Sequence, residues 1–429
     1  MKIRTGLAAG ALIMTGALLA GCSSSGTPTA ASSDGKLTGT VTGIWDSTFK
    51  DSIDPVAKAF EKEHPGVKMD ITYQGGDLSG VLSTQLQAGT APDLLITFPG
   101  GTPGTGGGTT VVTLASQGKL LDISSSPWTK TIPDQWKSEV NYKGKTYAYP
   151  GIAQGMGAVY DKTTLDKYGL TVPKTIDEVY SLCTAAKKAG VYAYAQGLGD
   201  AQGGPQMLSY AQTASLVYGP DPEATKQTTA GTFKFAKSGW KDQLEIYKKM
   251  FDMGCFGDGA LGRDRTQGAD EVAAGKALGI VDVSAVLGSI GAKAPKDELT
   301  FAPMPATDNP KDTFATALLG YTIAVNAKAK NPAAAQAFLQ FLSEPDQIAT
   351  HAAAFAALPA IPQKDYKAPA SLNEFAKYIE SGTFTKLPVW PNAATQPAIN
   401  ESIQGLLLGR DTVNGTLAKV QSAYDKGVE

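Results

Sequence analysis

Residues 41–96 read VTGIWDSTFKDSIDPVAKAFEKEHPGVKMDITYQGGDLSGVLSTQLQAGTAPDLLI, and they decide the fold. Three segments are predicted strands: 41–45, the alternating run 67–73, and the continuous apolar run 94–96. Two predicted helices lie between them, with apolar residues at helical spacing: Ile53, Val56, Ala57 and Phe60, then Leu78, Val81, Leu82 and Leu86. The order β-α-β-α-β predicts an open α/β sheet, whose ligands usually bind beyond the carboxyl ends of its strands.

The composition around this stretch excludes several classes of protein. The chain has 429 residues, enough for two or three domains, with 42% apolar and 18% charged residues, which is typical of a globular protein. A formal net charge of −2 argues against nucleic acid as the main partner, because phosphate binding needs a basic excess. Two histidines and three cysteines make a Cys/His zinc cluster improbable, so we expect no metal and no organic cofactor.

The N-terminus predicts export and lipidation. Lys2 and Arg4 precede an apolar run, Leu7 to Ala20, that is too short to span a membrane. The run ends at Leu19-Ala20-Gly21-Cys22, which looks like a bacterial lipobox. We therefore expect a signal peptide at 1–21, an acylated Cys22, and a flexible tether at 22–36; the alternative is an ordinary signal peptide followed by a chance cysteine.

The remaining cysteines are an even pair, Cys183 and Cys255. Thiols outside the cell can oxidise, so we predict a disulfide between them. Two buried free thiols are the alternative.

Four further segments, in this order along the chain, carry a resemblance to a known family. They are YKGKTYAYP (142–150) with VYDK (159–162), YGLTVPKT (168–175), AGKALG (274–279) with APMP (302–305), and AKNPAAA (329–335) with FLS (341–343). Together they resemble the extracellular solute-binding proteins of ABC importers, in the branch that includes the maltose- and oligosaccharide-binding members.

This resemblance implies a type II α/β fold of two hinged lobes with a ligand cleft between them. Lobe 1 would comprise 37–148 and 319–358, and lobe 2 would comprise 149–318 and 359–429. The hinge would lie around Tyr149-Pro150 and Leu318-Leu319-Gly320.

Candidate ligand contacts in lobe 1 follow predicted strands. A sugar site needs aromatic rings for the apolar sugar faces and hydrogen-bonding groups for the hydroxyls. Trp45 and Asp46 end the first strand, and Phe98 follows the third. Trp45 and Phe98 have core packing as their alternative. Asp77 can accept bonds from sugar hydroxyls or cap the next helix.

Candidate contacts in lobe 2 come from three segments. Trp390 lies where the family places a late stacking aromatic, and Gln206 and Tyr210 follow Gly203-Gly204-Pro205. Sugar binders often have a tryptophan in the 280–284 segment, where this chain has Asp282 and Ser284. That difference favours a small or more polar ligand.

Charge narrows the ligand class. The chain has four arginines: Arg4, Arg263, Arg265 and Arg410. Arg4 would leave with the signal peptide, and Asp264 suggests a local ion pair with its neighbours. Few guanidinium groups remain to clamp an anion, so a neutral carbohydrate is favoured over an amino acid, a peptide or a phosphate ester.

An enzyme is not expected. Ser238 and Lys241 have Ser-x-x-Lys spacing, but the chain lacks the Lys-Thr-Gly and Ser-Asp-Asn motifs that accompany it in penicillin-binding enzymes. The sequence thus predicts a monomeric, lipid-anchored receptor on the extracellular face of the bacterial cytoplasmic membrane, which captures a sugar and delivers it to an ABC permease. A receptor for another polar solute, a surface carbohydrate-active enzyme and a structural lipoprotein are the alternatives.

Overall fold

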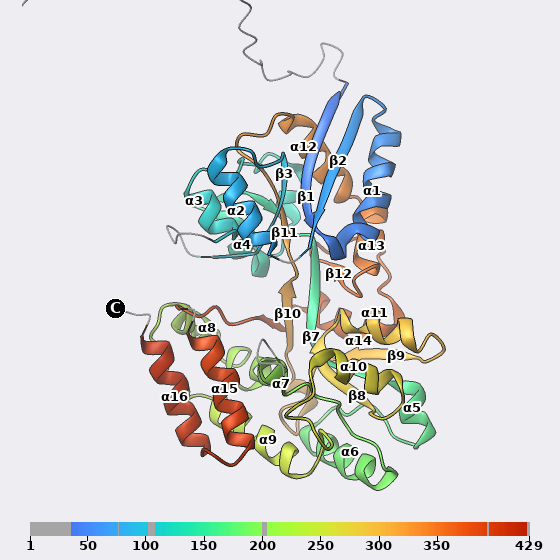
Figure 1. Cartoon of the computed structure of the whole chain (residues 1–429), viewed down its shortest axis with the longest axis vertical. Helices are drawn as coiled ribbons and strands as arrows, with labels where there is room; N and C mark the ends of the chain where they lie inside the picture. Colours follow the sequence, from blue (N-terminus) through green and yellow to red (C-terminus); the bar gives the residue numbers. More distant parts are fainter. Residues whose placement is uncertain (1–35, 76, 102–107, 200–203, 393, 427–429) are drawn as a thin grey trace, which may run out of the picture.

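A computed structural model describes residues 36–75, 77–101, 108–199, 204–392 and 394–426. It consists of two α/β bodies stacked along the long axis of the molecule (Figure 1). We call the upper body lobe 1 and the lower body lobe 2. The predicted signal peptide, Cys22 and nearly all of the predicted tether lie outside the described residues. Within the described ranges, no helix has the length and apolarity needed to cross a membrane.

Lobe 1 contains a five-stranded sheet with the strand order β2-β1-β3-β11-β6. Its strands are β1 (Gly39–Asp46), β2 (Val67–Gln74), β3 (Leu94–Thr97), β6 (Ala148–Tyr149) and β11 (Thr322–Val325). β1 pairs in parallel with β2 and β3, and β11 pairs antiparallel with β3 and β6. The predicted β-α-β-α-β unit is confirmed, because α1 (Lys50–Glu63) and α2 (Leu78–Ala88) are the two crossover helices.

Helix α2 begins at its predicted cap. Asp77 caps α2 by accepting a hydrogen bond from the backbone N–H of Gly80, and Gly89 ends that helix with a left-handed φ of 71°. The other helices of this lobe are α3 (Val111–Ser116), α4 (Asp134–Val140), α12 (Pro332–Leu342) and α13 (Pro345–Ala353). Phe60 on α1 packs against Phe338 on α12, with ring centroids 5.4 Å apart, so these two helices share one apolar layer.

Lobe 2 is built around one long strand, β7 (Ile152–Asp161). It pairs antiparallel with β8 (Gly279–Val283), β9 (Leu299–Ala302), β10 (Ala315–Leu319) and β12 (Leu358–Pro359). β13 (Phe384–Lys386) extends the sheet in parallel with β10. All but one of the residues of β7 are buried, as expected for a central strand covered on both faces.

Helices surround this second sheet. They are α5 (Lys162–Lys167), α6 (Ile176–Ala189), α7 (Gly204–Thr213), α8 (Pro222–Thr229), α9 (Trp240–Asp252), α10 (Arg265–Ala273), α11 (Val286–Lys293), α14 (Asn373–Ser381), α15 (Thr395–Leu407) and α16 (Val413–Asp425). The predicted disulfide is present: Cys183 on α6 is bonded to Cys255 just beyond α9, with the Cα atoms 4.8 Å apart.

The chain passes between the lobes at three places. β6 leads into β7 through Pro150-Gly151, and β10 leads into β11 through Gly320-Tyr321. The third passage leads from α13 of lobe 1 into β12, which pairs with the first residues of β7. Gly151 has a φ of +64°, and a Cβ there would lie 3.4 Å from the ring of Tyr321, so the first two passages are in contact. The predicted lobe boundaries fall beside these passages, and we retain them as a proposal for the units that move.

Candidate ligand cleft

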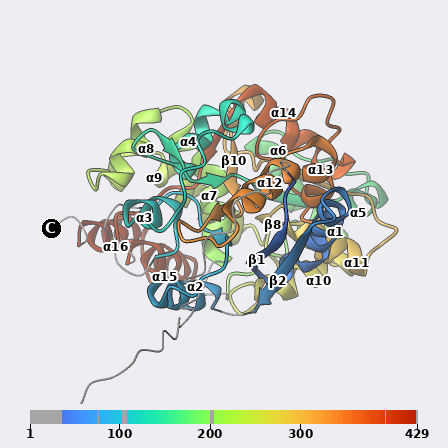
Figure 2. The ribbon, with the colours of Figure 1, turned by 90° about the horizontal axis from the view of Figure 1, so that it is seen from above.

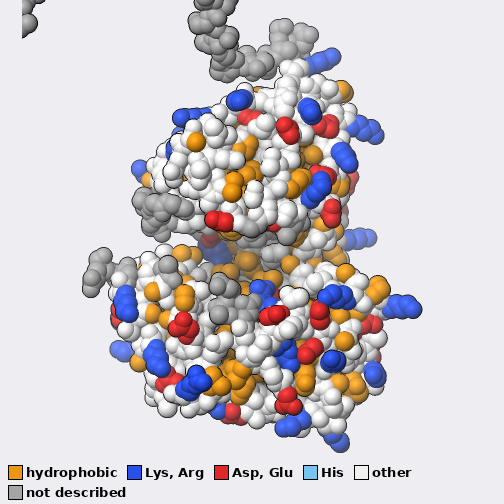
Figure 3. Space-filling model, in the orientation of Figure 1, with side chains coloured by type: hydrophobic (Ala, Val, Ile, Leu, Met, Phe, Trp, Pro, Cys, Tyr) orange, Lys and Arg blue, Asp and Glu red, His pale blue; other side chains and the backbone are white. Residues whose placement is uncertain are grey.

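A hollow of about 470 Å³ lies at the carboxyl ends of β1 and β3, beside the hinge. Figure 3 shows the furrow between the two lobes from one side. The hollow is lined by residues of lobe 1 and of the passage between β10 and β11: Asp46, Phe49, Asp77, Leu78, Ser79, Ile96, Thr97, Phe98, Gly320 and Tyr321. It therefore occupies the place where ligands bind in open α/β sheets.

Three of the residues predicted for lobe 1 meet at this hollow. Asp46 ends β1, Asp77 precedes α2, and Phe98 follows β3. Phe98 is 48% exposed, so its ring lies at the rim and not in the core of the lobe. Asp77 is the N-cap of α2 through Oδ1, and it also lines the hollow, so the cap and a ligand contact are compatible at this position.

The prediction that Trp45 contacts the ligand is wrong. Its side chain is fully buried, and its ring makes an edge contact with Phe338 on α12. Along a strand, alternate residues share a face, so Trp45 lies on the same face as Gly43. The indole leans back over Gly43, where a Cβ would come within 2.4 Å of the ring. The structure thus places Trp45 in the core of lobe 1, away from the cleft, because the helical layer covers its face of the strand.

Sequence reasoning missed two aromatic residues that line the hollow, Phe49 and Tyr321. Their ring centroids are 4.3 Å apart. The hydroxyl of Tyr321 is buried and has no hydrogen-bond partner among the residues described. The signal was present in the sequence, because Tyr321 directly follows the predicted hinge segment Leu318-Leu319-Gly320.

The structure brings together Gln206, Tyr210 and Trp390 in lobe 2 around a fourth residue, Gln396. The indole N–H of Trp390 donates to the hydroxyl oxygen of Tyr210 at 2.8 Å and to Oε1 of Gln396 at 3.2 Å. Tyr210 donates its hydroxyl hydrogen to Gln396, whose amide donates in turn to Gln206. Burial raises the pKa of Tyr210, so its hydroxyl stays protonated as a donor. We call these four residues the lobe 2 polar cluster.

Aromatic neighbours hold the ring of Trp390 in place. Its ring centroid lies between 5.8 and 6.3 Å from those of four others: Phe235, Trp240, Tyr210 and Tyr424. The segment that carries Trp390 leads from β13 to α15 along the end of lobe 2 that faces lobe 1 (Figure 1). The polar cluster therefore belongs to lobe 2, and its members do not line the hollow of lobe 1.

Asp282 and Ser284 are not on the wall of the cleft. Asp282 is 1% exposed and forms a two-point ion pair with Arg265, in which Nε lies 2.8 Å from Oδ2. Ser284 is fully buried, and its hydroxyl oxygen accepts a hydrogen bond from the backbone N–H of Gly155. Both side chains hold β8 in the lobe, because burial requires that such polar groups be paired.

Two arginines of lobe 2, Arg263 and Arg265, are paired with carboxylates. Nε of Arg263 lies 2.8 Å from Oε2 of Glu271, and Arg265 pairs with Asp282. Asp264, for which we expected a local ion pair, caps α10 by accepting from the backbone N–H of Gln267. No cluster of three or more potential metal ligands occurs in the described part of the chain.

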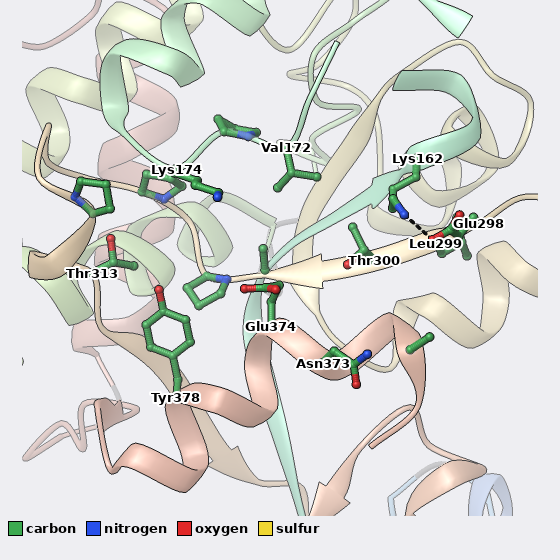
Figure 4. Close-up of a pocket in the computed structure, with 16 residues that line it drawn as sticks. Lys162, Val172, Lys174, Glu298, Leu299, Thr300, Thr313, Asn373, Glu374 and Tyr378 are labelled. Carbon is green, nitrogen blue, oxygen red and sulfur yellow. Dashed lines mark hydrogen bonds and ion pairs between the residues drawn. The ribbon is translucent and has the colours of Figure 1, made fainter. Parts of the chain in front are cut away.

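A second hollow, of about 540 Å³, lies within lobe 2 (Figure 4). β9, α14 and the segment before α6 line it, and Lys162 forms an ion pair with Glu298 at its edge. None of the residues predicted to contact ligand lines this hollow. The cleft beside the hinge is therefore the candidate site.

The fold and the cleft are those of a two-lobed binding protein, and the sequence agrees. Residues 46–349 match the family of bacterial extracellular solute-binding proteins. The chain belongs to this family.

Curated relatives match part of the chain. The melibiose/raffinose/stachyose-binding protein MelE of Bacillus subtilis is 27% identical over 205 residues, which are 47% of this chain and 45% of the relative. The maltodextrin-binding protein MdxE of the same species is 33% identical over 164 residues, 38% of this chain and 35% of the relative. The matched parts thus span less than half the length of these relatives.

Solved structures match nearly the whole chain. SBP RafE in complex with raffinose has a TM-score of 0.74 at 18% identity, covering 91% of this chain and 100% of that chain. The apo-form of RafE from Streptococcus pneumoniae has a TM-score of 0.77 at 18% identity, covering 91% and 98%. At this identity the likeness shows the shared fold, that of type II solute-binding proteins.

Proposed function

We propose that this protein is the solute-binding component of an ABC importer that takes up a neutral carbohydrate. Family membership, the cleft between the lobes, and relatives named for binding melibiose, raffinose, stachyose and maltodextrin support the proposal. The lipobox supports attachment to the extracellular face of the membrane through acylated Cys22. We propose that the protein acts as a monomer.

The observation that carries the proposal is the chemistry of the lobe 1 hollow, together with that of the polar cluster that we propose as its lobe 2 counterpart. Lobe 1 supplies two carboxylates and an exposed aromatic ring, while lobe 2 supplies a neutral cluster of amide, hydroxyl and indole groups. Such groups can accept from and donate to sugar hydroxyls, and an aromatic ring can pack on the apolar face of a sugar. The paired arginines leave an anionic solute without its preferred clamp.

Lobe closure is the proposed mechanism. The hollow is lined by lobe 1 and the hinge, and the polar cluster of lobe 2 does not line it. A ligand that contacts both surfaces favours the closed arrangement by the difference in its affinity for the two states. The closed form would then be the one that a permease recognises.

A binding screen tests the proposal. Calorimetry of the mature chain with melibiose, raffinose, stachyose and maltotriose should show binding of at least one of them. Binding of amino acids or phosphate esters alone would overturn the carbohydrate assignment. Phe98→Ala should weaken the binding, whereas Leu408→Ala, a matched control with similar exposure directly after α15, should not change it.

Two further measurements separate the alternatives. Product analysis after long incubation with the bound oligosaccharide should return it intact, and cleavage would favour a carbohydrate-active enzyme. Cys22→Ser should release the protein from membranes of the producing cell, while retention there would contradict the lipid anchor.

A further inference from the structure

The end of lobe 1 that lies farthest from lobe 2 is formed at the amino ends of its parallel strands. β1, β2 and β3 begin there, and β11, which is antiparallel to β3, ends there (Figure 1). Figure 2 looks down on this end of the molecule. Because the hollow lies at the carboxyl ends of β1 and β3, the two are at opposite ends of the sheet. Five segments form the surface of this end: 36–40, 62–70, 89–93, 117–119 and 326–331.

Hydrogen bonds join these five segments into one surface. Each bond runs from an N–H group of one segment to a backbone carbonyl of another. The donor and acceptor pairs are Gly39 and Gly66, Asn326 and Asp93, Ala327 and Lys119, and Asn331 (through its side chain) and Thr38. The backbone positions that carry the charges of these segments are therefore fixed relative to one another, so the charges act on a partner together.

This surface is basic although the protein is acidic. The five segments contain six lysines and three carboxylates, which gives a net charge of +3. The predicted mature chain, without Lys2 and Arg4, has 36 basic and 40 acidic residues and a net charge of −4, so the rest of it carries −7. We call this surface the basic end of lobe 1. Its lysines are Lys36, Lys62, Lys68, Lys119, Lys328 and Lys330.

Most of these lysines are accessible to a partner. Four of them are exposed and form no ion pair with another described residue: Lys62, Lys68, Lys328 and Lys330. The carboxylate of Asp93, by contrast, is buried and accepts hydrogen bonds from the backbone N–H groups of Lys330 and Asn331. The buried carboxylate thus holds two of the segments together, while the exposed side chains are mainly cationic.

The predicted lipid anchor leads to this end. Lys36 is the first described residue, and β1 begins three residues later at Gly39. Fourteen residues lead from Cys22 to Lys36, and a chain of that length spans at most about 50 Å. An acylated Cys22 would therefore join the membrane to the folded body at the basic end.

We propose that the basic end of lobe 1 binds the anionic phospholipid headgroups of the membrane that holds the anchor. The proposal rests on the lipid anchoring proposed above. Lysines near an anionic bilayer are attracted to it, and an acyl anchor together with a basic patch binds a membrane more firmly than either does alone. The same bilayer repels the net charge of −7 on the rest of the mature chain. Attraction at one end and repulsion elsewhere set the orientation of the protein.

This orientation suits the capture of a ligand. The parallel strands of lobe 1 run from the basic end to the hollow, so contact of the basic end with the bilayer directs the hollow away from it. The contact is electrostatic and depends on salt, because the distance over which charges act falls from about 10 Å at 0.1 M to about 3 Å at 1 M.

Lysine footprinting on vesicles tests the proposal. The mature chain has Cys22 as its free cysteine, since the other two form the disulfide, and this thiol is coupled to a maleimide lipid. The vesicles contain phosphatidylcholine alone or with an equal amount of phosphatidylglycerol. Brief acetylation with a water-soluble reagent is then read by mass spectrometry. On the anionic vesicles, the exposed lysines of the basic end should react about three- to tenfold more slowly than on the neutral ones.

Two controls come from the same digests. Lys187 and Lys188 are exposed on α6, at the lower end of lobe 2 in Figure 1, and should react at the same rate on both kinds of vesicle. Salt at about 1 M should remove the protection of the basic end. Equal rates at the basic end on both kinds of vesicle, or equal protection of Lys187 and Lys188, would overturn the proposal.

Charge reversal tests whether the position of the charges matters. Lys328→Glu/Lys330→Glu changes the basic end from +3 to −1 and should abolish the protection of its remaining lysines. Lys364→Glu/Lys367→Glu is the matched control, because it makes the same change in total charge at two exposed lysines between β12 and α14. It should leave the protection in place, and melting curves check that both variants fold. Equal loss of protection in the two variants would contradict a role for the basic end.

This experiment can be told apart from the tests of the proposed function. It uses no sugar and no permease, and the anchor is supplied chemically. A failed sugar screen, or a Cys22 that carries no lipid in the producing cell, would therefore leave the footprint as measured. Protection by soluble polyphosphate on neutral vesicles, without protection on anionic vesicles, would overturn the assignment to a membrane while leaving the carbohydrate receptor intact.

Discussion

The two groups of residues proposed to contact the ligand, one in each lobe, are built differently. Lobe 1 presents an exposed aromatic ring, Phe98, and the carboxylates of Asp46 and Asp77 at the ends of strands and the start of a helix. In lobe 2, Trp390 and the buried Tyr210 belong to a cluster whose groups already bond to one another. The lobe 1 group lines a hollow, whereas the lobe 2 group is held by its own hydrogen bonds.

This difference separates two kinds of tryptophan that look alike in the sequence. Trp45 is fully buried in the core of lobe 1, whereas Trp390 is half-buried and bonds to the lobe 2 polar cluster. Mutations in lobe 1 below the surface should therefore act on stability, and mutations in the lobe 2 cluster should act on affinity. The predictions below test that division.

The largest expected effect is on the stability of lobe 1. Trp45→Ala should lower the free energy of unfolding by about 3–5 kcal/mol, because it removes a fully buried ring that packs on Phe338. Urea denaturation measures the loss. Calorimetry on the folded fraction should show the same sugar affinity as the natural protein. A variant with unchanged stability and weakened sugar binding would instead indicate that Trp45 contacts the ligand.

Acid should destabilise the protein through His351 of lobe 1. Burial lowers the pKa of this histidine from its usual 6.5 to about 3, and it packs against the rings of Phe49, Tyr321 and Phe355. Below pH 6.5 the unfolded chain takes up a proton that the folded chain does not, so stability falls as the pH falls toward 3. At pH 4.5 the loss should be about 2–3 kcal/mol.

His351→Leu should remove this acid sensitivity. Unfolding at a series of pH values between 7 and 4 should give a flatter curve for the variant than for the natural protein. His64→Leu, at a histidine near the surface, is the control. Its stability should depend on pH as steeply as that of the natural protein. Identical slopes for His351→Leu and the natural protein would show that the buried histidine is not the cause.

Removal of the lobe 2 ring should act on binding. Trp390→Ala should weaken sugar affinity by about 2 kcal/mol, the size expected for a half-buried aromatic hot spot. Calorimetry with the sugar found in the screen gives the value, and a melting curve reports the accompanying change in packing. If Trp390→Ala binds the sugar as tightly as the natural protein does, Trp390 is not part of the binding site.

The smallest effect separates the two roles of Asp77. Asp77→Asn keeps a side-chain oxygen for the cap of α2 but removes the charge, while Asp77→Ala removes both. We expect Asp77→Ala to lose about 1 kcal/mol of stability, and both variants to lose about 1 kcal/mol of sugar affinity. If Asp77→Asn binds the sugar as tightly as the natural protein does, the only role of Asp77 is to cap α2.

Local patterns predicted the elements of the fold correctly. The strands at 41–45, 67–73 and 94–96 and the helices between them follow from spacing over a few residues, and the structure confirms them. The disulfide followed from the count of cysteines and the predicted compartment. These inferences use only neighbours in the sequence or elimination, so they did not need the tertiary structure.

The orientation of single side chains could not be predicted in this way. Which face of β1 Trp45 occupies depends on α12, nearly 300 residues later, and on the space above Gly43. The sequence predicted Asp282 as a ligand contact, but the fold pairs its carboxylate with Arg265. The lobe 2 polar cluster joins residues from α7 with others about 190 positions away, and no local period marks such a pair.

The interleaving of the two lobes has a consequence for how the chain assembles. β11 lies in the lobe 1 sheet between β3 and β6, and Thr97 and Thr322, which bond across β3 and β11, are 225 residues apart in the sequence. A growing chain therefore exposes the unpaired edge of β3 until residue 325 has been made, and unpaired edges invite wrong partners. Lobe 1 cannot be produced as one contiguous fragment, and its completion must await most of lobe 2.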